Sequence, residues 1–332
     1  MFLRQGGLEF QILETKRALE QLGCRVFFYH EPEATVGDVD IYHHFSVHPT
    51  STTVWEYFQA NSKKNVLSPI FQQADRVGRA KLAKLFSLSM GLDLFGYRTA
   101  KKRVNNVSAF QFLGPGEREE FNKFYNLPLQ QQEYTYVPNG VSALSLPVEE
   151  VAKAGNANKE LTVLCVGAVC PRKNQLGLIS AMRRTGRKFV CHFVGPIYDD
   201  SYFAACKSKA SGDNFIFHGQ LDNKSDQFAL LLKASDVFVL PSFSEVLPIS
   251  VLEALCNGVP VVCTVQCDAK YYLSNANGFI SVSPTDDRGI AQAIVKAENM
   301  HIVPDEVRYF RSKFHWSAVG ESVRGLYENI LC

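Results

Sequence analysis

Short apolar runs alternate with longer amphipathic stretches along the chain, and this alternation restricts the fold more than any other feature. Runs such as 237–240 and 259–262 are apolar throughout, as is typical of strands covered on both faces of a parallel sheet. Strands that alternate with helices predict βαβ units and an α/β fold. The expected strands are 25–29, 41–45, 66–69, 108–113, 135–137, 161–166, 189–194, 214–217, 237–240, 259–264 and 279–282, and the expected helices include 8–22, 225–234, 248–256 and 289–298.

The length of 332 residues suits two domains better than one. Hydrophobic residues make up 46% and charged residues 20%, which is a globular composition. The stretch 147–160 is polar and precedes a strong strand, so it predicts the domain boundary. We expect a first domain over 1–147, a second over 148–315, and a C-terminal helix over 316–332 that can pack back on the first domain.

Three global properties restrict the class of protein. The formal net charge is +2, which argues against a chain that coats nucleic acid. The sequence has no 18-residue apolar run typical of a transmembrane helix, and its first residues lack the apolar stretch of a signal peptide. The 9 cysteines form no Cys-x-x-Cys pair, so free thiols in a reducing cytosol are the simplest interpretation.

Positive charge is concentrated between Lys63 and Arg103, where ten cations face only Asp75 and Asp93. Apolar residues such as Leu85 and Phe86 are interspersed among the cations. Such a surface can contact anionic lipid head groups. The alternative is a helix packed on the core, with a basic face toward solvent.

The segment 237–264 has the pattern of a strand, a loop, a helix and a second strand. Pro248 suits the first helical turn, and Asn257-Gly258 suits the C-terminal cap. Backbone amides at this helix start would lie near the carboxyl end of a parallel strand, where open α/β sheets bind ligands and helix N-termini bind anions. Glu245 and Glu253 can accept hydrogen bonds from sugar or ribose hydroxyls; alternatively, Glu245 interacts with the helix dipole and Glu253 is solvated.

The segment 161–175 is a second strand and helix start, with Arg172 and Lys173 at the turn. Cations are unfavourable at a helix N-terminus because its dipole prefers anions. A bound diphosphate would relieve this conflict, whereas solvated surface cations are the alternative explanation. Together with the segment 237–264, this loop favours a phosphate-binding site.

These residues resemble the retaining GT-B glycosyltransferases of family GT4. The matching motifs, in chain order, are Pro138-Asn139-Gly140-Val141, Val166-Gly167 with Pro171-Arg172-Lys173-Asn174, Ser235-Asp236 with Pro241-Ser242, Glu245 and Glu253, Gly258–Val262, and Phe314-His315-Trp316. The resemblance is strong from Pro138 onward and weak over the first 130 residues. It implies two Rossmann-like domains whose parallel sheets face a central cleft that binds a nucleotide-sugar.

The resemblance also implies roles for individual residues. Arg172 and Lys173 would hold the diphosphate, Glu253 the ribose, and Glu245 the hydroxyls of the donor sugar. Leu247, Ile249 and Ser250 would offer amides around Pro248. Gly6 and Gly7 resemble the family's glycine loop in the first domain, although an ordinary tight turn has the same composition. The donor-facing histidine of the family is expected to be His44, or else His43.

The sequence departs from the family pattern at three places. The strand expected before Gly6 is nearly absent, Val246 stands where a glycine is common, and 265–269 replaces a glycine-containing loop. Asp38 and Asp40 imitate the Asp-x-Asp of metal-dependent GT-A enzymes, but they open a strand rather than follow one, so a solvated strand start is favoured.

The resulting hypothesis is a cytoplasmic glycosyltransferase that moves a hexosyl unit from a nucleoside-diphosphate sugar to an acceptor hydroxyl without a metal or cofactor. Its carbohydrate or lipid-linked acceptor would belong to polysaccharide or glycolipid synthesis, and the inner face of a membrane is a further possible location. Two alternatives are a sugar-nucleotide epimerase of the same fold and an inactive nucleotide-sugar-binding protein.

Overall fold

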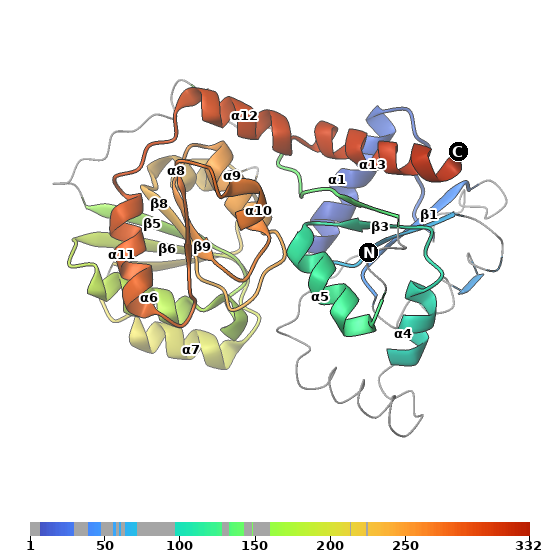
Figure 1. Ribbon diagram of the computed structural model, residues 1–332. Coiled ribbons are helices and arrows are strands. Elements are labelled where there is room, and N and C mark those ends of the chain that lie inside the picture. The colour runs from blue at the N-terminus through green and yellow to red at the C-terminus, as the bar shows by residue number, and fades with distance from the viewer. Residues whose placement is uncertain are drawn as a thin grey trace. The chain divides into compact units, whose positions relative to one another are not determined.

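The chain divides into two compact α/β units (Figure 1). The computed structural model describes residues 7–29, 39–47, 56–57, 60, 64–71, 97–127, 133–142, 148, 160–212, 214–223 and 225–332. Unit 1 combines Met1–Gly140 with Trp316–Cys332, and unit 2 is Val141–His315. The last helix therefore belongs with the first unit. No helix among the described residues has both the length and the apolar character needed to cross a membrane.

Unit 1 contains a parallel four-stranded sheet in the order β1-β2-β3-β4. Phenylalanine and tyrosine side chains fill much of its core, and Phe110, Phe112 and Phe121 are almost fully buried. The helices and strands that the structure describes in this unit are α1 (Gly7–Gln21), β1 (Ile41–Phe45), β2 (Lys64–Ser68), α4 (Tyr97–Val104), β3 (Ala109–Phe112), α5 (Pro115–Tyr125), β4 (Tyr134–Tyr136) and α13 (Trp316–Leu331).

Helix α13 lies alongside α1, although the two helices come from opposite ends of the chain (Figure 1). Gly320 permits this close approach, because a Cβ atom there would lie 2.8 Å from the Cβ of Ala18. Trp316 packs edge-on against Phe10, with ring centroids 6.1 Å apart. The C-terminal helix thus completes the core of unit 1.

Unit 2 contains a parallel six-stranded sheet in the order β10-β9-β8-β5-β6-β7. Helices α6, α7 and α11 cover one face, and α8 and α9 cover the other (Figure 1). The elements are β5 (Leu161–Val166), the 3₁₀ turn η6 (Pro171–Lys173), α6 (Gln175–Arg184), β6 (Phe189–Val194), α7 (Asp200–Lys209), β7 (Phe215–Gly219), α8 (Asp226–Ala234), β8 (Val237–Leu240), α9 (Ile249–Cys256), β9 (Val261–Thr264), α10 (Ala269–Leu273), β10 (Phe279–Val282), α11 (Asp287–Ala297) and α12 (Pro304–Phe314).

The buried strands explain why the sequence pattern was informative here. Every residue of β8 and β9 is buried, because helices cover both faces of the sheet. The predicted α/β class with parallel sheets is confirmed, and the switch in strand order beside β5 places the carboxyl ends of β5 and β8 next to each other. Ligands bind at this edge in open α/β sheets.

One expected strand is wrong. Residues 25–29 form no strand, even though their apolar composition resembles one. The segment follows the end of α1, and the ammonium group of Lys16 donates to the carbonyl oxygen of Val26 and lies 5.4 Å from the ring centre of Phe28. These contacts attach the segment to α1 instead of pairing it with a sheet edge.

Candidate active site

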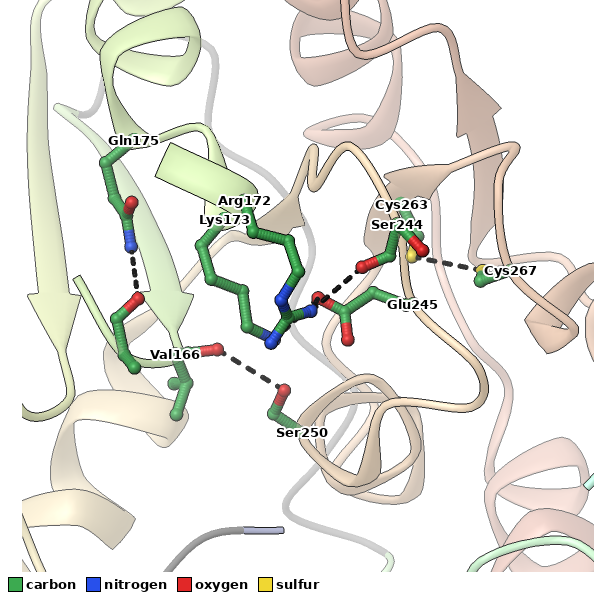
Figure 2. Close-up of polar contacts among 10 residues, drawn as sticks. Val166, Arg172, Lys173, Gln175, Ser244, Glu245, Ser250, Cys263 and Cys267 are labelled. Carbon is green, nitrogen blue, oxygen red and sulfur yellow. Dashed lines mark hydrogen bonds and ion pairs between the residues drawn. The ribbon is translucent and has the colours of Figure 1, made fainter. Parts of the chain in front are cut away.

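A buried ion cluster joins the two loops that the sequence singled out (Figure 2). Oε1 of Glu245 lies 2.6 Å from Nζ of Lys173 and 3.0 Å from Nη1 of Arg172. The Glu245 side chain is 5% exposed, Lys173 11% and Arg172 24%. The alternative of solvated surface cations is therefore excluded, because both side chains pair with a buried carboxylate.

The cations determine the ionisation of Glu245. Burial alone would raise the pKa of its carboxyl group, but the charges of Lys173 and Arg172 outweigh burial and lower this pKa. The carboxylate therefore stays ionised at neutral pH. Two cations around one anion leave one positive charge, so the cluster still attracts an anionic ligand.

Two glycines permit close packing at the carboxyl ends of β5 and β6, one against Lys173 and the other against the first glycine. A Cβ atom on Gly167, whose φ is +157°, would lie 3.2 Å from Cε of Lys173. A Cβ atom on Gly195, whose φ is +147°, would lie 2.2 Å from the carbonyl oxygen of Gly167. Sequence reasoning missed Gly195; its position directly after β6, parallel to that of Gly167 after β5, was the available signal.

The loop that carries Arg172 and Lys173 is also attached to the loop after β8. The amide of Phe243 donates to the carbonyl oxygen of Arg172 at 2.8 Å. Nη1 of Arg172 in turn donates to the carbonyl oxygen of Ser244 at 2.9 Å. These bonds hold Glu245 opposite Arg172 and Lys173 (Figure 2).

Asn174, directly after Lys173, is a second connection between loops. It has left-handed backbone angles, φ 56° and ψ 39°, and its side chain accepts a bond from the amide of Gly177 at the start of α6. Its Nδ2 atom donates to the carbonyl oxygens of Pro241 and Pro284, at 3.1 and 2.7 Å. One buried side chain therefore joins the loops after β5, β8 and β10.

Helix α9 begins at Ile249, and Pro248 precedes it as an extended N-cap residue. The placement of Pro248 inside the first helical turn was wrong by one position, because its ψ of 125° is not helical. Leu247 is 3% exposed. Oγ of Ser250 lies 3.4 Å from the carbonyl oxygen of Val166 (Figure 2), so the helix start adjoins the end of β5. The amides of Ile249 and Ser250 therefore lie at the edge where Arg172 and Lys173 are found.

Glu253 lies in the second turn of α9 and is 9% exposed. A solvated Glu253 is therefore excluded. Nδ2 of Asn223, a residue that sequence reasoning missed, lies 3.4 Å from its Oε1 atom. Burial raises the pKa of Glu253 to about 7, and the bond from Asn223 partly opposes this rise. A hydroxyl donor beside this carboxylate would lower the pKa again.

Residues 265–269, which stand where the family has a glycine-containing loop after β9, support the backbone of Glu245. The amide of Glu245 donates to the carbonyl oxygen of Gln266 at 3.1 Å, and the amide of Asp268 donates to that of Val246 at 2.7 Å. Sγ of Cys267 in this segment lies 3.8 Å from Sγ of Cys263 on β9 (Figure 2). Val246 and residues 265–268 thus form a fixed support for the ion cluster.

The two candidate histidines lie within β1. Nδ1 of His43 lies 2.6 Å from the Tyr327 hydroxyl, and its Nε2 lies 2.8 Å from the Ser68 hydroxyl. His44, on the other side of β1, has its Nδ1 3.1 Å from the Tyr42 hydroxyl. Burial lowers the pKa of His43 to about 3, and the neighbouring His44 adds to this shift. Burial also lowers the pKa of His44 to about 4, and the charge of Arg103 adds to that shift. Both imidazoles are therefore neutral at pH 7.

The remaining candidates of the first domain are only partly described. Gly7 starts α1 and is exposed, whereas Gly6 lies outside the described residues. Asp40 is exposed, and Asp38 is also outside them. In the described part of the chain, no three His, Cys, Asp or Glu side chains gather as metal ligands.

Much of the basic stretch between Lys63 and Arg103 lies outside the described residues, including all of 72–96. Within α4, Arg98 and Lys102 are exposed and Lys101 is half-buried. Arg103 is buried instead, and its Nη2 atom lies 3.9 Å from Oε1 of Glu56. The expectation that Arg103 contributes to a lipid-facing surface is therefore wrong.

Comparison with known proteins agrees with this geometry. Residues 148–311 match the family model of the glycosyl transferases group 1. The matched residues all lie within unit 2. A segment of 101 residues is 36% identical to TuaC of Bacillus subtilis, a protein assigned to teichuronic acid biosynthesis as a glycosyltransferase. This match covers 30% of the chain and 25% of TuaC.

Solved structures extend the likeness to both units of the chain. Anabaena HepE in complex with UDP-glucose has a TM-score of 0.71 and 14% identity, with 99% of this chain and 98% of HepE covered. The lipopolysaccharide outer core galactosyltransferase WaaB has a TM-score of 0.65 and 16% identity, with 98% of this chain and 96% of WaaB covered. Sucrose-phosphate synthase from Thermosynechococcus elongatus has a TM-score of 0.67 and 19% identity, with 88% of this chain and 73% of the synthase covered. At these identities the likeness shows the fold, and the predicted GT-B class is confirmed.

Proposed function

We propose that this chain is a retaining glycosyltransferase that moves a hexosyl unit from a nucleoside-diphosphate sugar to an acceptor hydroxyl without a metal ion. The observation that carries the proposal is the cluster of Arg172, Lys173 and Glu245 beside the start of α9, at the carboxyl edge of a parallel sheet. The group 1 match over residues 148–311 supports it. HepE, which has this fold, was solved with UDP-glucose, so a UDP-sugar is the first donor to test.

The reaction builds negative charge on the leaving diphosphate and positive charge on the donor sugar. Arg172 and Lys173 are held in place before the reaction by Glu245, so they can stabilise the leaving group without reorganising. The amides of Ile249 and Ser250 at the N-terminus of α9 add fixed dipoles of the same sign. These groups supply the electrostatic stabilisation that a metal ion provides in other transferases.

Glu253 and Glu245 take the two hydroxyl-binding roles in this proposal. Glu253 would accept a bond from the ribose, and Glu245, positioned by the cations, would accept from the donor sugar. In a retaining reaction of this kind the acceptor hydroxyl attacks from the face that the diphosphate leaves, and the departing phosphate helps to take its proton. His44, or else His43, stays the candidate for the donor-facing histidine of unit 1.

The acceptor is proposed to be a growing polysaccharide or a glycolipid. TuaC, assigned to teichuronic acid biosynthesis, and WaaB, an outer core galactosyltransferase, both support this substrate class. The enzyme would act in the cytoplasm, and the exposed cations Arg98 and Lys102 on α4 offer contacts to an anionic membrane.

The test is incubation of the purified chain with single nucleotide sugars, beginning with UDP-glucose, while nucleoside diphosphate release is measured. Slow release of UDP and first formation of α-glucose in the NMR spectrum would support a retaining transferase. Release of the β-anomer would refute retention. A free 2-epimer would indicate the epimerase alternative, and binding without turnover would indicate the inactive binding protein.

A matched pair of lysine variants shows whether turnover depends on the ion cluster. Lys173→Met removes a cation of the cluster, whereas Lys188→Met removes an exposed cation directly before β6. We expect turnover to be lost only in the first variant. Equal activity of both variants would remove the cluster from the proposed mechanism.

A further inference from the structure

Two histidines on neighbouring strands of unit 2 form a pair that the proposed reaction does not use. Nδ1 of His192 on β6 lies 2.9 Å from Nε2 of His218 on β7, and the ring centroids are 5.1 Å apart. Both side chains are half-buried. Strand β7 is the edge of the six-stranded sheet, so the pair lies at a border of unit 2 and remains accessible to solvent.

The separation of the two nitrogens suits a metal ion as well as a shared proton. A protein imidazole binds Zn²⁺ at about 2.0–2.1 Å. Two such ligands at octahedral or tetrahedral angles lie about 2.9–3.4 Å apart by the same bond length. The observed 2.9 Å falls at the lower end of this range, so an ion can bind between the rings with little change in the spacing of β6 and β7. The two rings then tilt until both nitrogen lone pairs point at the ion, and the proton of the hydrogen bond moves to the other nitrogen of its ring.

We propose that His192 and His218 form a binding site for a divalent transition-metal ion, with Zn²⁺, Ni²⁺ and Cu²⁺ as the ions that imidazole ligands favour. The site is independent of the proposed transferase reaction. Water would complete the coordination, because no third His, Cys, Asp or Glu of the described residues joins the pair. A two-ligand site of this kind is open and exchangeable, unlike the closed four-ligand sites of structural zinc.

The strand ends next to the pair lead to the candidate active site. Gly219 directly follows His218, and its carbonyl oxygen accepts a 2.8 Å bond from the amide of Gly195. Gly195 in turn lies against Gly167, beneath the stem of Lys173. An ion that bridges His192 and His218 would join β6 and β7 one residue from this contact, and it would stabilise the folded chain by mass action.

The test is calorimetric titration of the chelator-treated, dialysed chain with ZnCl₂ at pH 7.5. His218→Gln removes one ligand and retains an amide that can bond to His192. His301→Ala is the matched control, because His301 is a solvent-exposed histidine outside the pair. We expect saturable binding by the original chain and by His301→Ala, and at least a tenfold loss of affinity in His218→Gln.

Equal Zn²⁺ affinity of His218→Gln and the original chain would overturn the proposal, as would the absence of saturable binding. Melting temperatures without metal show whether His218→Gln is folded. If it is not, Cu²⁺ bound to the original chain decides the question: hyperfine structure from two imidazole nitrogens in its electron paramagnetic resonance spectrum is expected, and coordination by one or none refutes the site.

Discussion

Replacement of Asn174 tests whether one side chain holds the candidate donor site together. Asn174 accepts from the amide of Gly177 and donates to the carbonyl oxygens of Pro241 and Pro284, and it is 6% exposed. It also adopts the left-handed φ of 56° directly after Lys173. Alanine removes all three hydrogen bonds and disfavours this backbone conformation, whereas glycine removes the bonds but tolerates the conformation.

The expected cost follows from these contacts. Loss of the N-cap costs about 1 kcal/mol with alanine and a few tenths with glycine. Each of the two buried carbonyl groups that loses its donor costs about 1 kcal/mol. A left-handed residue with a Cβ costs roughly 1–2 kcal/mol, a penalty that glycine avoids. We therefore expect Asn174→Ala to lose about 4 kcal/mol and Asn174→Gly about 2 kcal/mol of unfolding free energy.

Urea denaturation measures these losses, and calorimetry with UDP measures the effect on the site. Asp286→Ala is the matched control, because Asp286 caps α11 through the amide of Gly289 but is exposed; it should cost about 1 kcal/mol and leave UDP affinity nearly unchanged. Asn174→Gly should stay folded and bind UDP more weakly. If Asn174→Ala costs no more than Asp286→Ala, the connection between the three loops contributes nothing beyond a helix cap.

Four further results are expected. Lys173→Met should cost about 3 kcal/mol of unfolding free energy, because it removes a partner of a buried carboxylate. Adding Glu245→Gln should recover much of that stability in urea denaturation, but it should not recover UDP binding. Recovery of both stability and UDP binding would show that the cluster is only structural. Burial raises the pKa of Glu253 to about 7, so the free energy of unfolding should fall as pH rises from about 4.5 to 7, while the affinity for UDP should rise. Glu253→Gln should flatten both pH profiles. An unchanged pH profile of UDP affinity in that variant would exclude a role of Glu253 in ribose binding. Transfer activity should survive EDTA, and loss restored by Mn²⁺ would refute metal independence. Binding to anionic vesicles should weaken when salt is added and in the double variant Lys101→Glu/Lys102→Glu. The control double variant Lys207→Glu/Lys209→Glu on α7 should bind as the original chain does. Equal sedimentation with neutral and anionic vesicles would contradict the lipid contact.

The sequence predicted the elements of unit 2 well because local patterns determine them. Apolar strands such as β8 are buried on both faces, and Asn257 with Gly258 ends α9 as expected. Parallel strands bring their carboxyl ends to one edge, so Arg172, Lys173 and Glu245 could be assigned to a common site. Their direct pairing was not predictable, because it joins residues 72 positions apart through the conformations of two loops. The connecting role of Asn174 was not predictable for the same reason, since its partners follow β8 and β10.

The surroundings of the histidines of β1 could not be predicted from the sequence. Alternation along a strand places His43 and His44 on opposite faces, but what covers each face depends on distant segments. His43 contacts Tyr327 on α13, 284 positions away, and Ser68 on β2; His44 has Tyr42 as a neighbour, and the charge of Arg103 acts on it. A substitution of His43 thus removes a contact that attaches α13 to the sheet, so lost activity in that variant does not identify a donor-facing histidine. Only a variant of either residue that retains its melting temperature and UDP affinity but loses turnover would do so.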